Sequence, residues 1–479
     1  MHPLFGKTSR ALVVMGLLLA VPYASPKLRK MRIADAPWDK TVEVAATPSA
    51  EALKVGEATL SASKNEGTVN NALPEAPKQL EIDPSVLAKA AGSLALEDET
   101  GHAMDAFYTH LAATIRKDPG AITRVLHYGD SLITSDFISG TMRRKMQTTF
   151  GDAGHGFILI ANAWDWYFHN DISHSATDGW TMSRITGPLN GDGMYGLGGV
   201  SFRASGPASA TFATKDASKG AEFGTKASRF DLYYLEQPGG GGVGLYAKGL
   251  APETLSTQGP KKVSRVHSIT VPDGAAQLTV KAWGEGARLF GVALERDVPG
   301  VVYDALGANG ARVKLLEAMN PDHWTEQMQL RKPALVVLQY GTNETAWGFD
   351  ESYEKVLTGI VDRIKAAAPD ASILILAPLD RAERAGAALK TMAVIPKLVQ
   401  AQKNVARDQK IAFWNTFEAM GGEGSMGKWV KANPQLAGWD LTHPTPEGAE
   451  LIGGMLYSAI VAGYQAYAAT HDGAPKLPQ

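Results

Sequence analysis

The chain has 479 residues, of which 44% are hydrophobic and 20% charged, and its formal net charge is −2 at pH 7. Because a single hydrophobic core stops growing at roughly 250–300 residues, this length predicts more than one domain. The nearly neutral charge, with no basic stripe among aromatic residues, argues against nucleic acid as a partner. The absence of cysteine from the sequence excludes disulfides, thiolate metal ligands and cysteine nucleophiles.

The first 80 residues are predicted to form an export segment and a linker. Lys7 and Arg10 precede a short apolar run that ends near residue 23, the pattern of a secretory signal. The run is short for a membrane span, which needs about 20 apolar residues. No Ala-x-Ala cleavage site follows it, so a retained membrane anchor is the alternative. We predict a signal peptide or anchor at 1–25, a disordered linker at 26–80, and a location in the periplasm or cell envelope.

A strand and a turn that carry a serine follow the linker. Helices are predicted at 84–92 and 104–117, and the second leads into an apolar strand that breaks at Gly129. Asp130 and Ser131 come next, where a helix is expected to begin. A serine there exposes its hydroxyl at the carboxyl end of a strand, and its N–H points into the helix mouth, where negative charge is favoured. The position suits a nucleophile, and a helix N-cap is the alternative role.

The hydrophobic pattern of the sequence changes after a predicted helix at 136–147. Between residues 164 and 296, short alternating apolar runs are separated by glycine-rich turns, including the run 238–242. Strands punctuated in this way predict a β-sandwich. Several aromatic residues near its start form either a sugar-binding surface or ordinary core. They are Trp164, Trp166, Tyr167, Phe168 and Trp180.

An alternation of strands and helices resumes near residue 299. It predicts a parallel sheet with helices on both faces, whose strand carboxyl ends gather the active site. One buried strand ends just before Gly341 and Asn343, and Asp440 and His443 lie three residues apart before the last helix. The predicted helices are 312–319, 353–368, 393–408 and 449–469, and the predicted strands include residue 335 and the runs 372–376 and 411–414.

Four short blocks resemble, in their order, those of the SGNH or GDSL-type hydrolases. The resemblance implies an α/β domain with a flavodoxin-like, three-layer parallel sheet. A β-sandwich between the first two blocks is similar to the peptidoglycan O-acetylesterase branch, whose inserted, jelly-roll-like module resembles carbohydrate-binding domains. The hydrolase parts are expected at 81–165 and 299–472, around an insert at 166–298. The blocks are Gly129-Asp130-Ser131, Gly307-Ala308-Asn309-Gly310, Gly341-Thr342-Asn343 and Asp440-Leu441-Thr442-His443.

These residue types supply the chemistry of ester hydrolysis. Ser131 is expected to attack the carbonyl, with His443 as the base and Asp440 as the group that orients the imidazole. The family pattern assigns the oxyanion hole to the N–H of Ser131, the N–H of Gly310 and the side-chain amide of Asn343.

Other polar residues near these blocks are assigned structural roles. Asp130 is expected to hydrogen-bond the backbone and shape the turn, and His127 to be a buried histidine with a partner. His155, His169 and His174 lack a compact ligand spacing, so neither a metal site nor a cofactor is predicted.

The sequence predicts an SGNH-type serine esterase that removes O-acetyl groups from peptidoglycan or another surface polysaccharide through an acyl-enzyme. The alternatives are an O-acetyltransferase with the same triad and a non-catalytic wall-binding protein. The presence of all three residues of the oxyanion hole favours hydrolysis over acetyl transfer. Leu132 and Ile133 follow the serine, where the resembling branch commonly has a histidine. The sequence leaves open the glycan, the acyl group and the oligomeric state.

Overall fold

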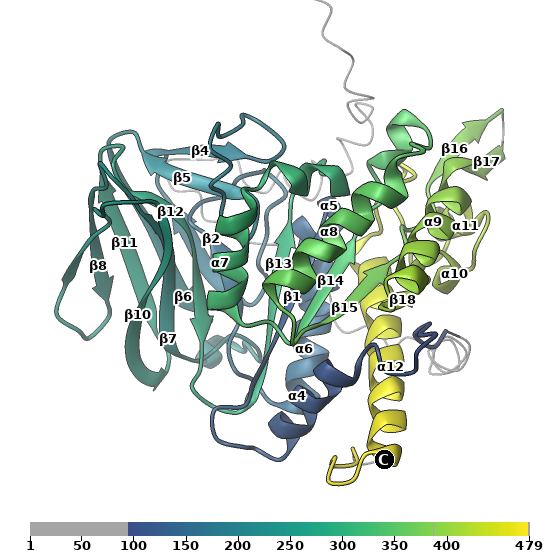
Figure 1. The fold of residues 1–479 in the computed structure, drawn as a ribbon, viewed down its shortest axis with the longest axis horizontal. Helices are drawn as coiled ribbons and strands as arrows, with labels where there is room; N and C mark the ends of the chain where they lie inside the picture. Colours follow the sequence, from purple (N-terminus) through teal and green to yellow (C-terminus); the bar gives the residue numbers. More distant parts are fainter. Residues whose placement is uncertain (1–93, 387, 478–479) are drawn as a thin grey trace, which may run out of the picture. The chain divides into compact units, whose positions relative to one another are not determined.

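The computed structural model describes residues 94–386 and 388–477 (Figure 1). The predicted export segment at 1–25, the linker at 26–80 and the helix at 84–92 lie outside the described residues. In the described part of the chain, no helix is both long and apolar enough to cross a membrane.

A five-stranded parallel sheet carries three of the four sequence blocks at the ends of its strands. Numbered along the chain, its strands lie in the order 2-1-3-4-5, which is the flavodoxin-like order. Its strands are almost entirely buried, because helices cover both faces. This confirms the predicted fold class. From one edge to the other, the strands are β13 (Gly300–Gly307), β1 (Ile122–Gly129), β14 (Leu335–Gln339), β15 (Ser372–Leu376) and β18 (Ala412–Trp414).

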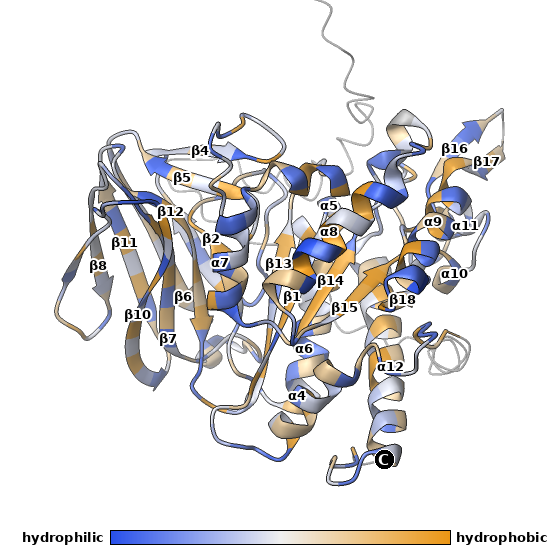
Figure 2. Cartoon of the chain, in the orientation of Figure 1, coloured by the Kyte–Doolittle hydropathy of each residue, from blue (hydrophilic) through white to orange (hydrophobic). Residues whose placement is uncertain are grey.

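Successive side chains of these strands enter two different cores. Leu126 and Val336 join the core under one set of helices, and Val125 and Leu335 join the core under the other. Figure 2 shows how hydrophobic residues are concentrated in β1, β14 and β15. One set of helices is α7 (Pro321–Arg331), α8 (Tyr353–Ala367) and α9 (Val394–Asp408); the other is α4 (Asp105–Ile115), α6 (Phe137–Phe150) and α12 (Pro446–Thr470).

Two antiparallel sheets face each other as a sandwich between α6 and β13 in the chain. The first strand, β2, pairs with the last, β12, so the insert begins and ends side by side. One sheet contains β10 (Val263–Gly274), β7 (Ala227–Glu236), β12 (Arg288–Glu295), β5 (Val200–Ala204), β4 (Trp180–Arg184) and, beside β12, β2 (Gly156–Leu159). The other contains β3 (Ile172–Ala176), β6 (Pro207–Thr214), β11 (Gln277–Trp283), β8 (Gly242–Ala247) and β9 (Glu253–Ser256).

The remaining elements are short. Residues 312–319, predicted to be helical, contain the 3₁₀ helix η5 (Val313–Ala318). The pattern does not predict α7, because its buried face carries polar side chains such as Gln327 and Arg331. The others are α5 (Ser131–Thr134), η4 (Ala217–Lys219), η6 (Glu344–Trp347), α10 (Thr416–Ala419), α11 (Ser425–Val430) and the hairpin of β16 (Ala382–Ala385) and β17 (Ala388–Thr391).

A buried cluster of charges joins the sandwich to the parallel sheet. Glu295, at the end of β12, accepts hydrogen bonds from Arg124 of β1 at 2.9 and 2.8 Å. It also pairs with Arg229 and with Arg331 of α7. Burial by itself raises the pKa of Glu295, but Arg331 and Arg124 hold it far below its usual range. On the other side, Arg331 binds Asp304 of β13 at 2.6 and 2.8 Å.

Replacement of Glu295 by alanine is expected to destabilise the protein by about 3–5 kcal/mol, because it leaves buried guanidinium groups without their carboxylate. The free energy of unfolding, from urea titrations, measures this. Glu253→Ala is the control, since the Glu253 side chain is 49% exposed beside His267 and such a pair contributes about 1 kcal/mol or less. Equal losses in the two variants would contradict the assignment.

Candidate active site

The turn after β1 places Ser131 at the carboxyl edge of the sheet, where the strand order reverses between β13 and β14. In doubly wound sheets this switch point is the usual ligand site. Asp130 is buried and caps α5, because its Oδ1 accepts the N–H of Leu132 at 3.0 Å. A Cβ at Gly129 would lie 2.5 Å from the Ile133 side chain, so only glycine allows so tight a turn. The predicted role of Asp130 in shaping the turn is confirmed.

Ser131, His443 and Asp440 form a continuous chain of hydrogen bonds. Ser131 Oγ lies 2.8 Å from His443 Nε2, across 312 residues of sequence. His443 Nδ1 lies 2.6 Å from Asp440 Oδ2. Asp440 Oδ1 accepts the N–H groups of Thr442 and His443 at 3.0 and 3.1 Å. The carboxylate therefore holds the imidazole on one side while the other ring nitrogen faces the serine hydroxyl.

Local backbone structure positions the loop that carries Asp440 and His443 next to Ser131. Leu441 has a left-handed conformation, with φ of 60°, which turns the chain between the acid and the histidine. Thr445 then caps α12 by accepting the N–H of Gly448 at 3.2 Å, and Pro446 occupies the first helical turn, where its missing N–H costs nothing. Because α12 packs against α6, which follows the serine turn, the two ends of the site are joined by helix packing.

The charges around His443 favour its protonated form. Desolvation lowers the pKa of His443, but the hydrogen bond and charge of Asp440, with the charge of Asp130, raise it overall, while Arg381 opposes them. Burial raises the pKa of Asp440, but its contacts with His443 lower it overall. A carboxylate that stays ionised beside an imidazole that gains a proton is the arrangement a hydroxyl nucleophile requires.

Two further blocks meet at the same edge. The N–H of Ser131 is the first of α5 and so has no acceptor within that helix. Gly310, with φ of 75°, lies in a turn closed by the bond from Ala311 N to Ala308 O at 3.0 Å. Asn343 Nδ2 donates to Ala311 O at 3.0 Å and retains a second N–H. The turns that carry Ser131, Gly310 and Asn343 thus lie at the same edge of the sheet, and their role as an oxyanion hole stays a prediction.

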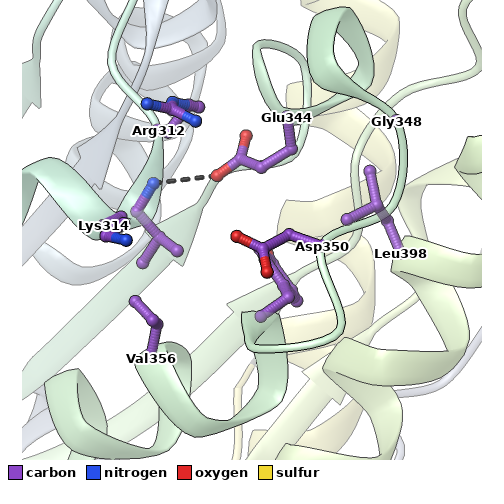
Figure 3. A pocket seen from close by; sticks show the side chains of 9 residues that line it. Arg312, Lys314, Glu344, Gly348, Asp350, Val356 and Leu398 are labelled. Atoms are coloured by element: carbon purple, nitrogen blue, oxygen red, sulfur yellow. Dashed lines mark hydrogen bonds between the residues drawn. The ribbon is translucent and has the colours of Figure 1, made fainter.

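A buried carboxylate lies beside Asn343 and was not predicted. Glu344 Oε1 accepts the N–H of Val313 at 2.8 Å, which ties the asparagine turn to η5. Burial raises the pKa of Glu344 to about 7. Figure 3 shows the pocket that this side chain lines, with Arg312, Lys314 and Asp350 around it. Nothing in the sequence distinguishes this glutamate from a surface residue, because its burial depends on η5 and α8.

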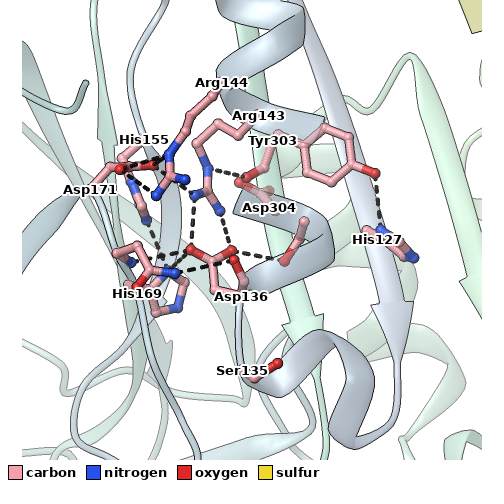
Figure 4. Close-up of polar contacts among 12 residues, drawn as sticks. His127, Ser135, Asp136, Arg143, Arg144, His155, His169, Asp171, Tyr303 and Asp304 are labelled. Carbon is pink, nitrogen blue, oxygen red and sulfur yellow. Dashed lines mark hydrogen bonds and ion pairs between the residues drawn. The ribbon is translucent and has the colours of Figure 1, made fainter. Parts of the chain in front are cut away.

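A second buried polar cluster lies next to the end of α5, the short helix that begins at Ser131 (Figure 4). Arg143 binds both oxygens of Asp136 at 2.9 and 2.8 Å, at the start of α6. His155 Nε2 lies 2.8 Å from His169 Nδ1, and ligand atoms of Asp136, His155 and His169 all lie within 4.8 Å of one another. These residues are far apart in sequence, so their spacing did not suggest that they meet.

The charges of this cluster do not favour a metal ion. Arg143 pairs with Asp136, and Arg144 binds Asp171 at 2.9 Å, so each carboxylate already has its cation. Burial lowers the pKa of His169 to about 3, which leaves the imidazole neutral. A divalent cation here would add buried positive charge next to a guanidinium. The absence of a metal site therefore stays a prediction. His127 is also buried, with its Nδ1 2.9 Å from the Tyr303 hydroxyl.

Comparison with known proteins finds a family match over the second half of the site. Residues 267–451 match the GDSL-like lipase/acylhydrolase family. That span contains Gly310, Asn343, Asp440 and His443, whereas Ser131 lies outside it. This segment of the chain is thus similar to the GDSL-like, or SGNH-type, hydrolases.

Solved structures resemble this chain to different extents. A peptidoglycan O-acetylesterase shares 24% identity at a TM-score of 0.65, over 78% of this chain and 99% of that one, and therefore has the same fold. An acetylxylan esterase from Geobacillus stearothermophilus shares 20% identity at a TM-score of 0.26, over 34% of this chain and 73% of that one. A family two carbohydrate esterase from Clostridium thermocellum shares 11% at 0.25, over 59% and 98%. No match was found among curated proteins.

The protonation of His443 predicts the pH dependence of this hydrolase. Only the neutral imidazole accepts the serine proton, and its surroundings raise the pKa above the ordinary value. Activity towards p-nitrophenyl acetate is therefore expected to rise with pH through an apparent pKa above about 6.5. The profile of kcat/KM between pH 5 and pH 9, corrected for spontaneous hydrolysis, measures it, and a midpoint well below 6.5 would contradict this account.

Proposed function

We propose that the chain is a carbohydrate O-acetylesterase, which removes acetyl groups from peptidoglycan or another surface polysaccharide through an acyl-enzyme on Ser131. The observation that carries the proposal is the hydrogen-bonded chain from Ser131 through His443 to Asp440 at the switch point of the sheet. The fold shared with a peptidoglycan O-acetylesterase over 99% of its chain supports this class of substrate.

The proposed reaction uses groups already in contact. His443 Nε2 accepts the hydroxyl proton as Ser131 Oγ bonds to the acetyl carbon. The imidazolium then gives that proton to the departing sugar oxygen, which leaves an acetyl ester on Ser131. Water, whose proton passes to His443, attacks this ester. Acetate leaves as the serine oxygen recovers a proton from the imidazolium.

Three donors are proposed to stabilise the negative oxygen that forms at each attack. They are the N–H of Ser131, the N–H of Gly310 and the free N–H of the Asn343 amide. The hydrogen bond from Asn343 Nδ2 to Ala311 O fixes the plane of the side-chain amide. One N–H of this amide is used by that bond, and the other is held in a fixed direction as a donor to the negative oxygen. Donors fixed in advance lower the barrier because they need not reorient when the charge appears.

The predicted export segment at 1–25 would bring the enzyme to the envelope, where such glycans lie. Ester hydrolysis needs neither metal nor cofactor in this mechanism, and the polymer to be deacetylated is the proposed partner.

Release of acetate from O-acetylated peptidoglycan tests the proposal. Ser131→Ala is expected to lower kcat by about 10³-fold or more, because no nucleophile remains. Ser135→Ala, a serine four residues further at the end of α5, is the matched control and should retain activity. Acetate that appears only as transfer to an added sugar would indicate an acetyltransferase instead. A wild-type protein that binds the polymer but releases no acetate would indicate a wall-binding protein.

Removal of one oxyanion donor tests the role of the asparagine. Asn343→Ala is expected to lower kcat by about 10²–10³-fold with little change in KM, since the lost bond acts mainly in the transition state. Asn404→Ala is the control, because Asn404 lies on α9 and bonds Glu354. Steady-state kinetics of both variants decide it, and a change confined to KM would refute the assignment.

A further inference from the structure

Arg381 holds the turn that contains Asn343. It lies five residues beyond the end of β15, at the carboxyl edge of the sheet. Its Nη1 donates to the carbonyl of Thr342 at 2.9 Å and also to the hydroxyl of Thr345. The Thr345 hydroxyl in turn donates to the same carbonyl at 2.7 Å. These bonds close a ring around the backbone on either side of the asparagine.

The asparagine turn also packs closely against the segment that carries Arg381. Gly341 has φ of 133°, and a Cβ there would lie 2.7 Å from the ring of Pro378, which precedes Arg381 on the neighbouring strand end. The asparagine turn and the arginine segment therefore approach each other as closely as their backbones allow. A guanidinium that donates across this contact fixes the position of one turn relative to the other.

The charge of Arg381 also acts on the triad. It interacts favourably with the carboxylates of Asp440 and Asp130, and it lowers the pKa of His443. The charged groups that act on His443 are thus Asp440 on its own loop, Asp130 from the turn after β1, and Arg381 from the segment after β15.

The backbone beside Arg381 is also hydrogen-bonded to the loop of residues 440–443, which carries Asp440 and His443 and is called the triad loop below. Ala382 N donates to Leu441 O at 3.1 Å, within the loop between Asp440 and His443. On the preceding side, Asp380 Oδ2 accepts the N–H of Met426 at 2.7 Å. The segment around Arg381 is therefore hydrogen-bonded to the triad loop on one side and to α11 on the other.

We propose that Arg381 is a positioning residue that couples the two halves of the active site: it clamps the Asn343 turn through Thr342 and Thr345, and its charge acts on the triad loop to which its segment is hydrogen-bonded. This inference rests on the proposed function, since it gives the residue a part in the same ester hydrolysis. Neither effect requires Arg381 to touch the substrate.

Three variants separate the two effects. Arg381→Gln removes the charge and keeps an amide donor; Arg381→Lys keeps the charge and loses the planar fork; Thr345→Val removes one partner of the clamp and leaves the charge. The control is Arg384→Gln, an exposed arginine three residues along in β16. The readouts are kcat and KM on p-nitrophenyl acetate and the pKa of His443, followed by NMR of its imidazole.

We expect the pKa of His443 to rise by about 0.5 or more in Arg381→Gln, because a nearby cation no longer opposes protonation. In Thr345→Val and Arg381→Lys we expect the pKa to stay at its wild-type value while kcat falls by about tenfold or more with KM little changed, as the asparagine amide loses its position. Arg384→Gln should match wild type in both.

An unchanged pKa of His443 in a folded Arg381→Gln variant would contradict the proposed action of the Arg381 charge on the triad. An unchanged kcat in Thr345→Val would contradict the proposed role of Arg381 in holding the Asn343 turn. Should Arg381→Gln not fold, a shifted His443 pKa in Arg381→Lys would count against the inference, since the charge is kept. The NMR titration needs no turnover. A protein without esterase activity in which Arg381→Gln still shifts His443 would refute the proposed function alone, whereas an active enzyme with no shift would refute the coupling alone.

Discussion

The hydrogen bond between Ser131 and His443 joins the first strand of the parallel sheet to a loop near the end of the chain. It forms only because β1 lies inside the sheet, between β13 and β14, so that its carboxyl end opens at the point where the strand order reverses. The packing of α12 against α6 carries the histidine loop to the same edge. The proposed ester hydrolysis depends on this convergence of segments that are distant in sequence.

The inserted sandwich leaves that convergence intact because its ends lie together. Its first strand, β2, pairs with its last, β12, and the N–H of Arg296 donates to the carbonyl of Ala153 at 2.8 Å just outside this pair. The chain therefore leaves the α/β domain and returns to it at nearly the same place, and β1 and β13 pair along their full lengths. The buried ion pairs of Glu295 and Arg331 then fix the sandwich to the sheet.

Buried charge is used in different ways at the two ends of α5. Next to its end, Asp136 and Arg143 neutralise each other, and two neutral imidazoles complete the cluster without a net charge. At its start, in the active site, the charges of Asp130, Asp440 and Arg381 all act on the imidazole of His443. The Asp136 cluster is balanced and serves packing, whereas the active site keeps a titratable group whose pKa depends on all its neighbours.

The sequence by itself determined the classes of element and the reacting residue types. Apolar runs such as 335–339 and 372–376 predict buried strands because both sheet faces are covered, and helices at 353–368 and 393–408 follow from apolar side chains on one face. Ser131, Asn343, Asp440 and His443 stand out because they follow strand ends or precede a helix. Tertiary structure alone decided which polar side chains are buried and what they touch. Glu344 and Arg381 look like surface residues in the sequence. Helix α7 is not recognised in the sequence because its buried face is polar, and His155 and His169 meet only once the chain between them has folded. Each of these outcomes depends on neighbours that other parts of the chain supply.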